Sequence, residues 1–496
     1  MAFYVFRMVN HMIKKWLAIG IILLFVGVTI APAIAQNTEQ QSTSRGNWLY
    51  VGGSGPGNYT KIQDAINDAS DGDTVFVYDD SSPYDENLRI KKSIQLIGEN
   101  KTSTIINSSS QITIDTYDYD NIFIQGFTLI NNCNHTEQTY GVFISFAENF
   151  TLTDTIIIGC HWGVKLVDCS NCSIENNEIR DGTFGISAYE VFTSTFGNNT
   201  IVDNKCGIEF NYAKNNKVNN NTFRNNGMLL SGYSYPNSYF GNTVNNKPLL
   251  YLANKQNLII QNTSVGQLFL LNCTNITVRN IEVSNASYGI QIIRSNNCLI
   301  TKTNVHSNYN AGITLQEQCQ NNTISYNDIT SNDYGINCES YYFPFEYNNF
   351  IGNTIRFNRN GIRVEGSKNT IQDNIVENND KGIRVIGSQN KILNNAIRNS
   401  TTTGLYLYAA ERCLIKSNNF INNQDHAEFE KYSILGSHFR SNYWSDSTGI
   451  GPKIIWGSRG FVVGFDRNGW PIIQMVPWAQ FDWFSVKEPY DISGMS

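Results

Sequence analysis

The chain has 496 residues, of which 41% are hydrophobic and 16% charged, so it can bury an extended core and is not a disordered tail. Its net charge of −6 at pH 7 provides no basic field for a phosphate backbone, which excludes nucleic acid as an expected partner. About one residue in seven is Asn, and Ile dominates the aliphatic residues, a bias that favours β-structure.

The first 35 residues have the pattern of a secretory signal. Arg7, Lys14 and Lys15 precede an apolar run from Trp16 to Ala31, and Ala33-Ile34-Ala35 fits the small-residue rule for a cleavage site. We expect a signal peptide at residues 1–35, a polar linker at 36–46 and an extracellular or cell-surface protein. The alternative is an uncleaved membrane anchor, because about 20 apolar residues can span a bilayer. In that case we expect the protein to contact the membrane only through this N-terminal segment.

Residues 47–110 predict an N-terminal cap and the first coils of a solenoid. Thr60 and Gln63 fit a capping box, and the apolar residues from Ile62 to Ala69 recur at helical spacing. We expect a short amphipathic helix that covers the open end of the stack.

A repeat of about 22 residues follows. It is marked by a Gly and an aliphatic residue at Gly141, Gly163, Gly185, Gly207, Gly289, Gly312, Gly335, Gly361, Gly382 and Gly404. Short segments that alternate apolar and polar residues between turn residues indicate strands with one buried face. We predict an all-β fold, a single-stranded right-handed parallel β-helix of about 14 coils over residues 111–440, with modified coils between Gly227 and Gly289 where the period slips.

Each unit also has an Asn three positions after an apolar residue. In a parallel stack, such an amide can donate to one neighbouring coil and accept from the other. We therefore predict a structural ladder formed by Asn177, Asn199, Asn221, Asn327, Asn353, Asn374, Asn395 and Asn418.

The composition changes again at residues 441–496. Five of the eight tryptophans lie here: Trp444, Trp456, Trp470, Trp478 and Trp483. Large rings usually serve cores, so we predict an aromatic C-terminal cap. The alternative is a platform on which sugars stack.

Several motifs resemble a known family. They are G-D-T-V-F-V at 72–77, P-Y-D-E-N-L at 83–88, K-S-I-Q-L-I-G at 92–98, G-N-T-V-N-N-K-P-L-L at 241–250 and S-N-Y-W-S-D-S-T-G-I-G-P-K-I-I at 441–455. With the Gly-Ile units, they make the chain similar, over about residues 47–490, to exported NosD-like β-helix proteins of the pectate-lyase-like superfamily, also described as carbohydrate-binding and sugar-hydrolase domains and frequent on archaeal surfaces. The resemblance implies the fold, and the family name derives from periplasmic copper handling.

Candidate catalytic groups are sparse. A polysaccharide hydrolase needs two or three carboxylates that converge on one groove, whereas the densest acids, Asp79, Asp80, Asp85 and Glu86, lie beside the N-terminal cap. We assign no catalytic residue and expect no cofactor. A polysaccharide lyase or glycoside hydrolase is the alternative function.

Copper binding is the second alternative. Soft ligands select copper, but the His, Met and Cys residues are scattered, and Cys160 and His161 are the best, weak metal candidates. Cysteines at equivalent positions do not fall in adjacent coils, so they lie too far apart for disulfides, and most should be buried thiols.

Outward positions suggest carbohydrate binding. Two loops, 231–240 and 341–347, are rich in aromatic residues, and Arg363, Arg384 and Tyr406 follow the Gly-Ile or Gly-Leu mark in successive coils. The two like charges need a counter-charge. Glu365, on the same outward face, is one candidate, and an anionic sugar is the alternative. The candidate carbohydrate-binding residues are Tyr233, Tyr235, Tyr239, Tyr342, Phe343, Arg363, Arg384 and Tyr406.

These features together predict a non-catalytic, exported surface β-helix. We expect it to bind polysaccharide or envelope glycans, or to serve as an envelope or adhesion scaffold. About 14 N-x-S/T sequons are consistent with glycosylated surface loops.

Overall fold

The structure is a computed structural model that describes residues 46–133, 138–231, 233–339, 345–432, 435–448, 451–466 and 470–492. The predicted signal segment and most of the predicted linker lie outside these residues. Residues 46–496 form one compact unit. Within the described residues, no helix is both long and apolar enough to cross a membrane.

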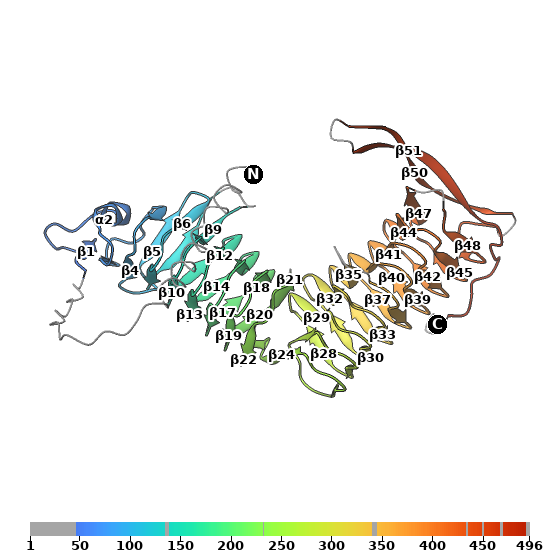
Figure 1. Cartoon of the computed structure of the whole chain (residues 1–496), viewed down its shortest axis with the longest axis horizontal. Helices are drawn as coiled ribbons and strands as arrows, with labels where there is room; N and C mark the ends of the chain where they lie inside the picture. The colour runs from blue at the N-terminus through green and yellow to red at the C-terminus, as the bar shows by residue number, and fades with distance from the viewer. Residues whose placement is uncertain are drawn as a thin grey trace, which may run out of the picture. The chain divides into compact units, whose positions relative to one another are not determined.

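The fold is an all-β, right-handed parallel β-solenoid, as predicted. It has about 18 turns rather than the expected 14, because the first coils carry no Gly-Ile mark and cannot be counted by it. The coils form two consecutive stacks (Figure 1). In each stack, three parallel sheets run along the axis, and one of them contains the Gly-Ile segments; we call this the Gly-Ile sheet.

The first stack contains three sheets. Its Gly-Ile sheet comprises β3 (Leu88–Ile90), β6 (Ile112–Tyr117), β9 (Tyr140–Ser145), β12 (Trp162–Val167), β15 (Phe184–Tyr189), β18 (Cys206–Asn211) and β21 (Met228–Ser231). The second sheet comprises β1 (Trp48–Val51), β2 (Thr74–Val77), β4 (Gln95–Gly98), β7 (Phe123–Gln125), β10 (Thr151–Thr153), β13 (Ser173–Glu175), β16 (Thr195–Gly197), β19 (Lys217–Asn219) and β22 (Ser238–Phe240). The third comprises β5 (Ile105–Ser108), β8 (Thr128–Asn131), β11 (Ile156–Ile158), β14 (Glu178–Arg180), β17 (Thr200–Val202), β20 (Thr222–Arg224) and β23 (Thr243–Val244).

The second stack repeats this plan. Its Gly-Ile sheet comprises β24 (Lys247–Ala253), β26 (Gln267–Leu271), β29 (Tyr288–Ile293), β32 (Ala311–Gln316), β35 (Tyr334–Glu339), β38 (Asn360–Glu365), β41 (Lys381–Ile386), β44 (Thr403–Tyr408), β47 (Asp425–Lys431) and β50 (Lys453–Phe465). The next sheet comprises β25 (Ile259–Gln261), β27 (Thr277–Arg279), β30 (Leu299–Thr301), β33 (Thr323–Ser325), β36 (Asn349–Ile351), β39 (Thr370–Gln372), β42 (Lys391–Leu393), β45 (Leu414–Lys416), β48 (His438–Arg440) and β51 (Pro471–Asp482). The last comprises β28 (Glu282–Ser284), β31 (Asn304–His306), β34 (Asp328–Thr330), β37 (Thr354–Arg356), β40 (Ile375–Glu377), β43 (Ala396–Arg398), β46 (Asn419–Ile421) and β49 (Tyr443–Trp444).

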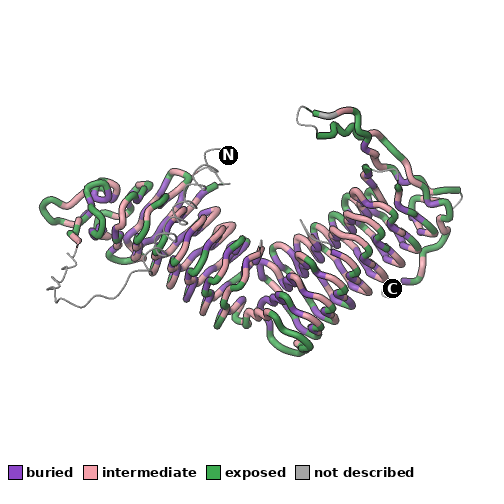
Figure 2. The backbone as a smooth tube through the Cα atoms, in the orientation of Figure 1, coloured by how far each residue is buried: buried purple, intermediate pink, exposed green. Residues whose placement is uncertain are grey.

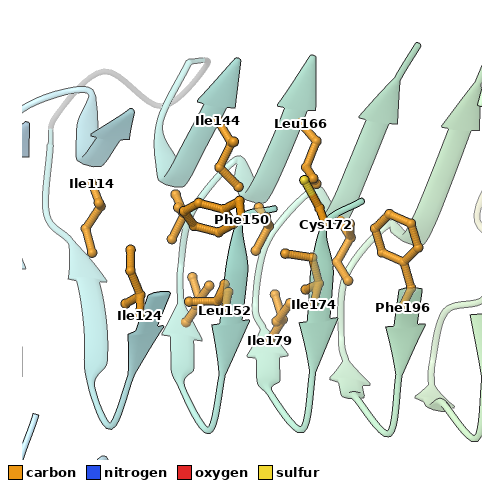
Figure 3. Packing of buried hydrophobic residues seen from close by; sticks show 14 of the residues in the cluster. Ile114, Ile124, Ile144, Phe150, Leu152, Leu166, Cys172, Ile174, Ile179 and Phe196 are labelled. Carbon is orange, nitrogen blue, oxygen red and sulfur yellow. The ribbon is translucent and has the colours of Figure 1, made fainter. Parts of the chain in front are cut away.

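The core lies along the axis of each stack. Side chains along a strand alternate between the two faces of the sheet, so every second one points into the core. Because adjacent strands pair in register, equivalent residues of successive coils lie next to one another. In the first stack Leu152, Ile174 and Phe196 are consecutive partners in adjacent strands, and all three are fully buried (Figure 3). The alternation of buried and partly exposed segments continues along both stacks (Figure 2).

Asparagine side chains hydrogen-bond between coils at the turns. Asn374 Oδ1 accepts from the backbone N of Asn353 at 2.9 Å, and Asn374 Nδ2 donates to Asn395 Oδ1 at 2.9 Å. The same bonds connect Asn177, Asn199, Asn221 and Asn242 in the first stack, and Asn327, Asn353, Asn374, Asn395, Asn418 and Asn442 in the second. Buried amides thereby satisfy one another and the turn backbone.

One helix, α2 (Ile62–Asp68), lies at the N-terminal end and buries Ile62, Ala65 and Ile66. The predicted capping box is wrong, because the N-cap residue is Lys61 and makes no side-chain cap. Glu86 caps the helix instead: its carboxylate accepts from the backbone N of Ile62 at 2.8 Å and of Gln63 at 3.0 Å. A carboxylate at this position also suits the positive end of the helix dipole.

The stacks meet where the period slips. The Gly-Ile sheet of the first stack ends at β21, and the chain turns back through an antiparallel pairing of β23 with β24. One edge of β21 has no neighbouring strand among the described residues. Glutamine side chains of the second stack bind its backbone instead: Gln267 bonds to Met228, and Gln291 bonds to Leu230. Phe269 and Leu271 of β26 pack against the core of the first stack.

The C-terminal end has a single capping tryptophan. Trp444 is buried and stacks on Phe420 at 4.2 Å. The buried Asp482 terminates the Asn ladder by accepting from Asn442 Nδ2 at 2.9 Å. The other four tryptophans are at least 38% exposed, because β50 and β51 extend beyond the stack as an antiparallel hairpin (Figure 1).

Candidate functional site

The outward position two residues after each repeat Gly forms one continuous row on each Gly-Ile sheet, which we call the Gly-Ile row. Strand pairing aligns its members in register. In the first stack the row is Phe143, Lys165, Ser187 and Glu209. In the second it is Gln291, Thr314, Asn337, Arg363, Arg384 and Tyr406.

The first part of the row is satisfied internally. Lys165 Nζ donates to Ser187 Oγ at 2.8 Å, and Ser187 Oγ donates to Glu209 Oε2 at 2.6 Å. Burial lowers the pKa of Lys165, and the charge of Glu209 opposes that shift. Ser187 is only 1% exposed, and this chain of groups connects opposite charges across two coils.

The second part has unmet hydrogen-bonding capacity. Thr314 Oγ1 and Asn337 Oδ1 are buried and have no hydrogen-bond partner. The sequence analysis missed both residues, although they stand at the same place after Gly-Ile as the two arginines. Native proteins leave few buried polar groups unpaired, so their clustering on one row is a mark of function.

Arg363 is neutralised by two carboxylates. Its Nε donates to Glu365 Oε1 at 2.9 Å, and its Nη1 lies 3.3 Å from Glu339 Oε2. Burial alone would lower the pKa of Arg363, but the hydrogen bond and charge of Glu365 outweigh that effect and raise it. This cation is therefore occupied within the protein.

Arg384 lies one coil further along and lacks these partners. Among the described residues no carboxylate pairs with it, and its buried Nε has no hydrogen-bond acceptor. The residue opposite Glu365 is Ile386, so the neighbouring outward position supplies no acceptor. The Nε side of a guanidinium is one edge at which a carboxylate can bind with two hydrogen bonds, and in Arg384 the Nε of that edge is buried and has no acceptor among the described residues.

Tyrosine rings border this guanidinium. The Arg384 Cζ lies 5.5 Å from the ring centre of Tyr406 and 5.8 Å from that of Tyr408. Tyr406 Oη donates to Glu430 Oε2 at 3.1 Å. Burial, assisted by Glu430, raises the pKa of Tyr406 to about 12, which keeps its hydroxyl protonated at neutral pH. β50 adds a further strand to this sheet and carries Trp456, which is 64% exposed.

The predicted aromatic loop 231–240 lies at the junction of the stacks. Arg294 covers Tyr233 and Tyr235, with its Cζ 4.2 and 4.9 Å from their ring centres. Tyr239 packs on Tyr251 at 4.2 Å. The hydroxyls of Tyr235 and Tyr239 are buried without a partner. One face of each ring is thus occupied by the protein. Tyr342 and Phe343 lie outside the described residues.

The copper candidates do not form a metal site. Cys160 is buried, its Sγ donates to the Ile158 carbonyl at 3.6 Å, and burial raises the pKa of its thiol to about 12. The ring of His161 packs 4.1 Å from that of Trp162. Within the part of the chain that the structure describes, no three His, Cys, Asp or Glu side chains are arranged to hold a metal ion. Nine of the ten cysteines are buried, and all are free thiols.

The acids beside the N-terminal cap are engaged in local structure. Asp79 accepts from Ser103 at 2.5 Å, Asp80 accepts from the backbone N of Gly53 at 2.9 Å, and Asp85 accepts from Asn107 at 2.7 Å. Glu86 is the helix cap described above. These bonds hold the first coils together and account for the clustering of acids there.

The sequence matches two family models. The model described as periplasmic copper-binding protein (NosD) matches residues 66–258 and 337–459. The model described as right handed beta helix region matches residues 245–396. None of the curated proteins compared with the chain matches it.

Several solved structures are similar to the chain. The mannuronan C-5 epimerase AlgE4 A-module of Azotobacter vinelandii is 16% identical over 62% of this chain and 93% of its own, with a TM-score of 0.26. An alginate lyase of Paenibacillus sp. str. FPU-7 is 12% identical over 59% and 98%, with a TM-score of 0.30. The pectin methylesterase PemA of Erwinia chrysanthemi is 13% identical over 50% and 88%, with a TM-score of 0.26.

Proposed function

The chain belongs to the NosD family of β-helix proteins, and we propose that it binds an anionic polysaccharide on the Gly-Ile row of its second stack. The observation that carries this proposal is the half-buried guanidinium of Arg384, which has no carboxylate partner among the described residues. A buried donor without an acceptor costs free energy, and a ligand carboxylate would relieve that cost through a paired, charge-assisted contact.

The surroundings of Arg384 favour a sugar acid over a small anion. Tyr406 and Tyr408 present half-exposed rings beside the guanidinium, and such rings pack against the apolar face of a pyranose while their hydroxyls bond to its polar groups. Arg363, Arg384 and Tyr406 are half-buried neighbours in successive coils, so an extended polymer could contact three successive coils and gain affinity from weak individual contacts.

The family description supports an exported protein, because it names a periplasmic location. A place at the cell surface, with envelope glycans as the ligand, is part of the proposal. Copper binding is not part of the proposal, since the described residues contain no group of three or more His, Cys, Asp or Glu side chains that could hold a metal ion.

Calorimetric titration with a hexagalacturonate and with a neutral hexasaccharide tests the proposal. The wild-type chain should bind the uronate, and Arg384→Gln should weaken that binding at least tenfold, about the value of a charged hydrogen bond. Arg279→Gln, at an exposed position on a different sheet, is the matched control and should leave affinity unchanged. The sugar should be recovered without new reducing ends. Equal affinity of the wild-type and Arg384→Gln chains would refute the proposal.

A further inference from the structure

A groove of about 400 Å³ lies on the second stack, on different sheets from the Gly-Ile row. It is lined by Tyr326, Asp328, Gly352, Arg356, Asp373 and Glu377. We propose that this groove is a separate binding site for a pyranose that carries no carboxylate, either a neutral sugar or an amino sugar. This inference does not rest on the function proposed for Arg384.

Tyr326 provides an aromatic surface that is held in place by the backbone. Its ring is 63% exposed and projects from a turn in which its φ is 54°, an unusual conformation for a bulky residue. The ring passes over Gly352, where an added Cβ would lie 2.6 Å from Tyr326 Cε1. One side of the ring is thus supported by Gly352, and the rest faces solvent.

Successive turns build the groove. The backbone N of Tyr326 donates to Ile351, that of Gly352 donates to Gln372, and that of Asp373 donates to Leu393. The three turns are therefore stacked, and Gly352 lies between Tyr326 in the preceding turn and Asp373 in the following turn. The absence of a side chain at Gly352 makes room for the Tyr326 ring, and only a residue that tolerates its φ of 65° fits there.

The lining charges select against uronic acids. Three carboxylates and one guanidinium line the groove. Arg356 pairs with Asp328 at 3.1 Å, and Glu377 pairs with Arg398 at 2.6 Å. Asp373 accepts amide hydrogens from Gln372 at 2.9 Å and Asn394 at 2.5 Å, and no cationic side chain among the described residues pairs with it. Asp328 Oδ1 is buried and has no donor. Ionised carboxylates only accept hydrogen bonds, so the partly exposed Asp373 suits sugar hydroxyls or an ammonium group and repels a second carboxylate.

The groove and the Gly-Ile row thus differ in charge. Within the part of the chain that the structure describes, Arg384 has no carboxylate partner and Asp373 has no cationic partner. Two sites of opposite preference on one β-helix would allow the protein to hold two different glycans at once.

Binding measurements with three hexasaccharides test the proposal: N-acetylglucosamine, glucosamine and galacturonate hexamers. The wild-type chain should bind one or both of the first two, and Tyr326→Ala should weaken that binding at least tenfold. Asp373→Asn should weaken the glucosamine hexamer selectively if the amino group is recognised, and weaken both hexamers to a similar extent if hydroxyls are recognised. Phe357→Ala is the matched control, because Phe357 is 60% exposed in a left-handed turn outside the groove.

The variants separate the two sites. Arg384→Gln should not alter binding of the glucosamine compounds, and Tyr326→Ala should not alter binding of the uronate. The proposal is overturned if neither glucosamine compound binds, if Tyr326→Ala binds them as the wild type does, or if Tyr326→Ala loses uronate binding instead. Circular dichroism and the unfolding midpoint of each variant verify that the fold is retained.

Discussion

The side-chain amide of Gln267 makes both hydrogen bonds that a neighbouring strand would offer to Met228. Its Oε1 accepts from the Met228 backbone N at 2.8 Å, and its Nε2 donates to the Met228 carbonyl at 2.6 Å. Gln291 contacts Leu230 in the same way, two residues along β21. Side chains thereby satisfy the last strand edge of the first stack, which would otherwise be buried without partners.

Replacing Gln267 should therefore destabilise the junction. Gln267→Met retains the volume of the fully buried side chain but removes both hydrogen bonds. We expect a loss of about 2 to 4 kcal/mol in the free energy of unfolding, because two buried backbone groups lose their partners. Urea unfolding measures the loss. Gln256→Met, at an exposed position, should be nearly neutral, and equal midpoints for the two variants would contradict this account.

The Asn ladder should be equally sensitive in the middle of the second stack. Asn374 makes bonds to Asn353, to Asn395 and to the Phe350 carbonyl. Asn374→Ala should lower the free energy of unfolding on the order of 3 kcal/mol. Asn399→Gly, in an exposed turn with φ of 55°, is the control and should cost little. A small effect of Asn374→Ala would show that the ladder does not stabilise the stack.

Releasing Arg363 should strengthen anion binding. Glu365→Gln removes one of the two carboxylates that neutralise Arg363 and leaves Glu339 as its only carboxylate partner among the described residues, so a more weakly paired guanidinium stands beside Arg384. We expect a severalfold higher affinity for the hexagalacturonate and a steeper loss of affinity with salt. Glu411→Gln, a carboxylate outside the row, should have no effect. A weaker or unchanged affinity of Glu365→Gln would exclude Arg363 from the ligand's path.

The C-terminal end should lose stability in mild acid. Burial lowers the pKa of His426; Lys453 adds to that effect, while Asp446, 3.4 Å from its Nε2, and Asp425 oppose it. Because the folded-state pKa lies below the unfolded value of about 6.5, the unfolded chain takes up the proton first. The contribution of neutral His426 is therefore present above that pH and is lost as the pH falls through the window between the two pKa values.

Thermal unfolding at pH 7.5 and 5.5 measures this effect. The wild type should lose more stability between these values than His426→Asn, which retains a hydrogen-bonding side chain but cannot titrate. An identical pH dependence of the two proteins would contradict the assignment.

The repeat marks were legible in the sequence because backbone sterics enforce them. An added Cβ at Gly335 would lie 2.6 Å from the Gly361 carbonyl oxygen, so each coil needs its glycine at the same place. The first coils have no glycine at this position, so the count of about 14 coils based on the glycine mark was lower than the observed number of about 18. Capping of α2 by Glu86 depends on a contact 24 residues away, which no local pattern specifies.

The difference between the two arginines was present in the sequence but was not used. G-I-R-V is followed by Glu365 in one coil and by Ile386 in the next, and outward neighbours along a strand decide which cation is paired. The Tyr326 groove was not predictable in this way, because Tyr326, Gly352 and Asp373 are separated by unequal spacings. Only the stacked turns bring them together.

A crystal structure of the chain bound to the hexagalacturonate tests the central claim most directly. We expect a sugar carboxylate about 2.8 Å from a guanidinium nitrogen of Arg384, with the pyranose against Tyr406 or Tyr408. A uronate bound elsewhere, with the Arg384 guanidinium facing only water, would contradict it.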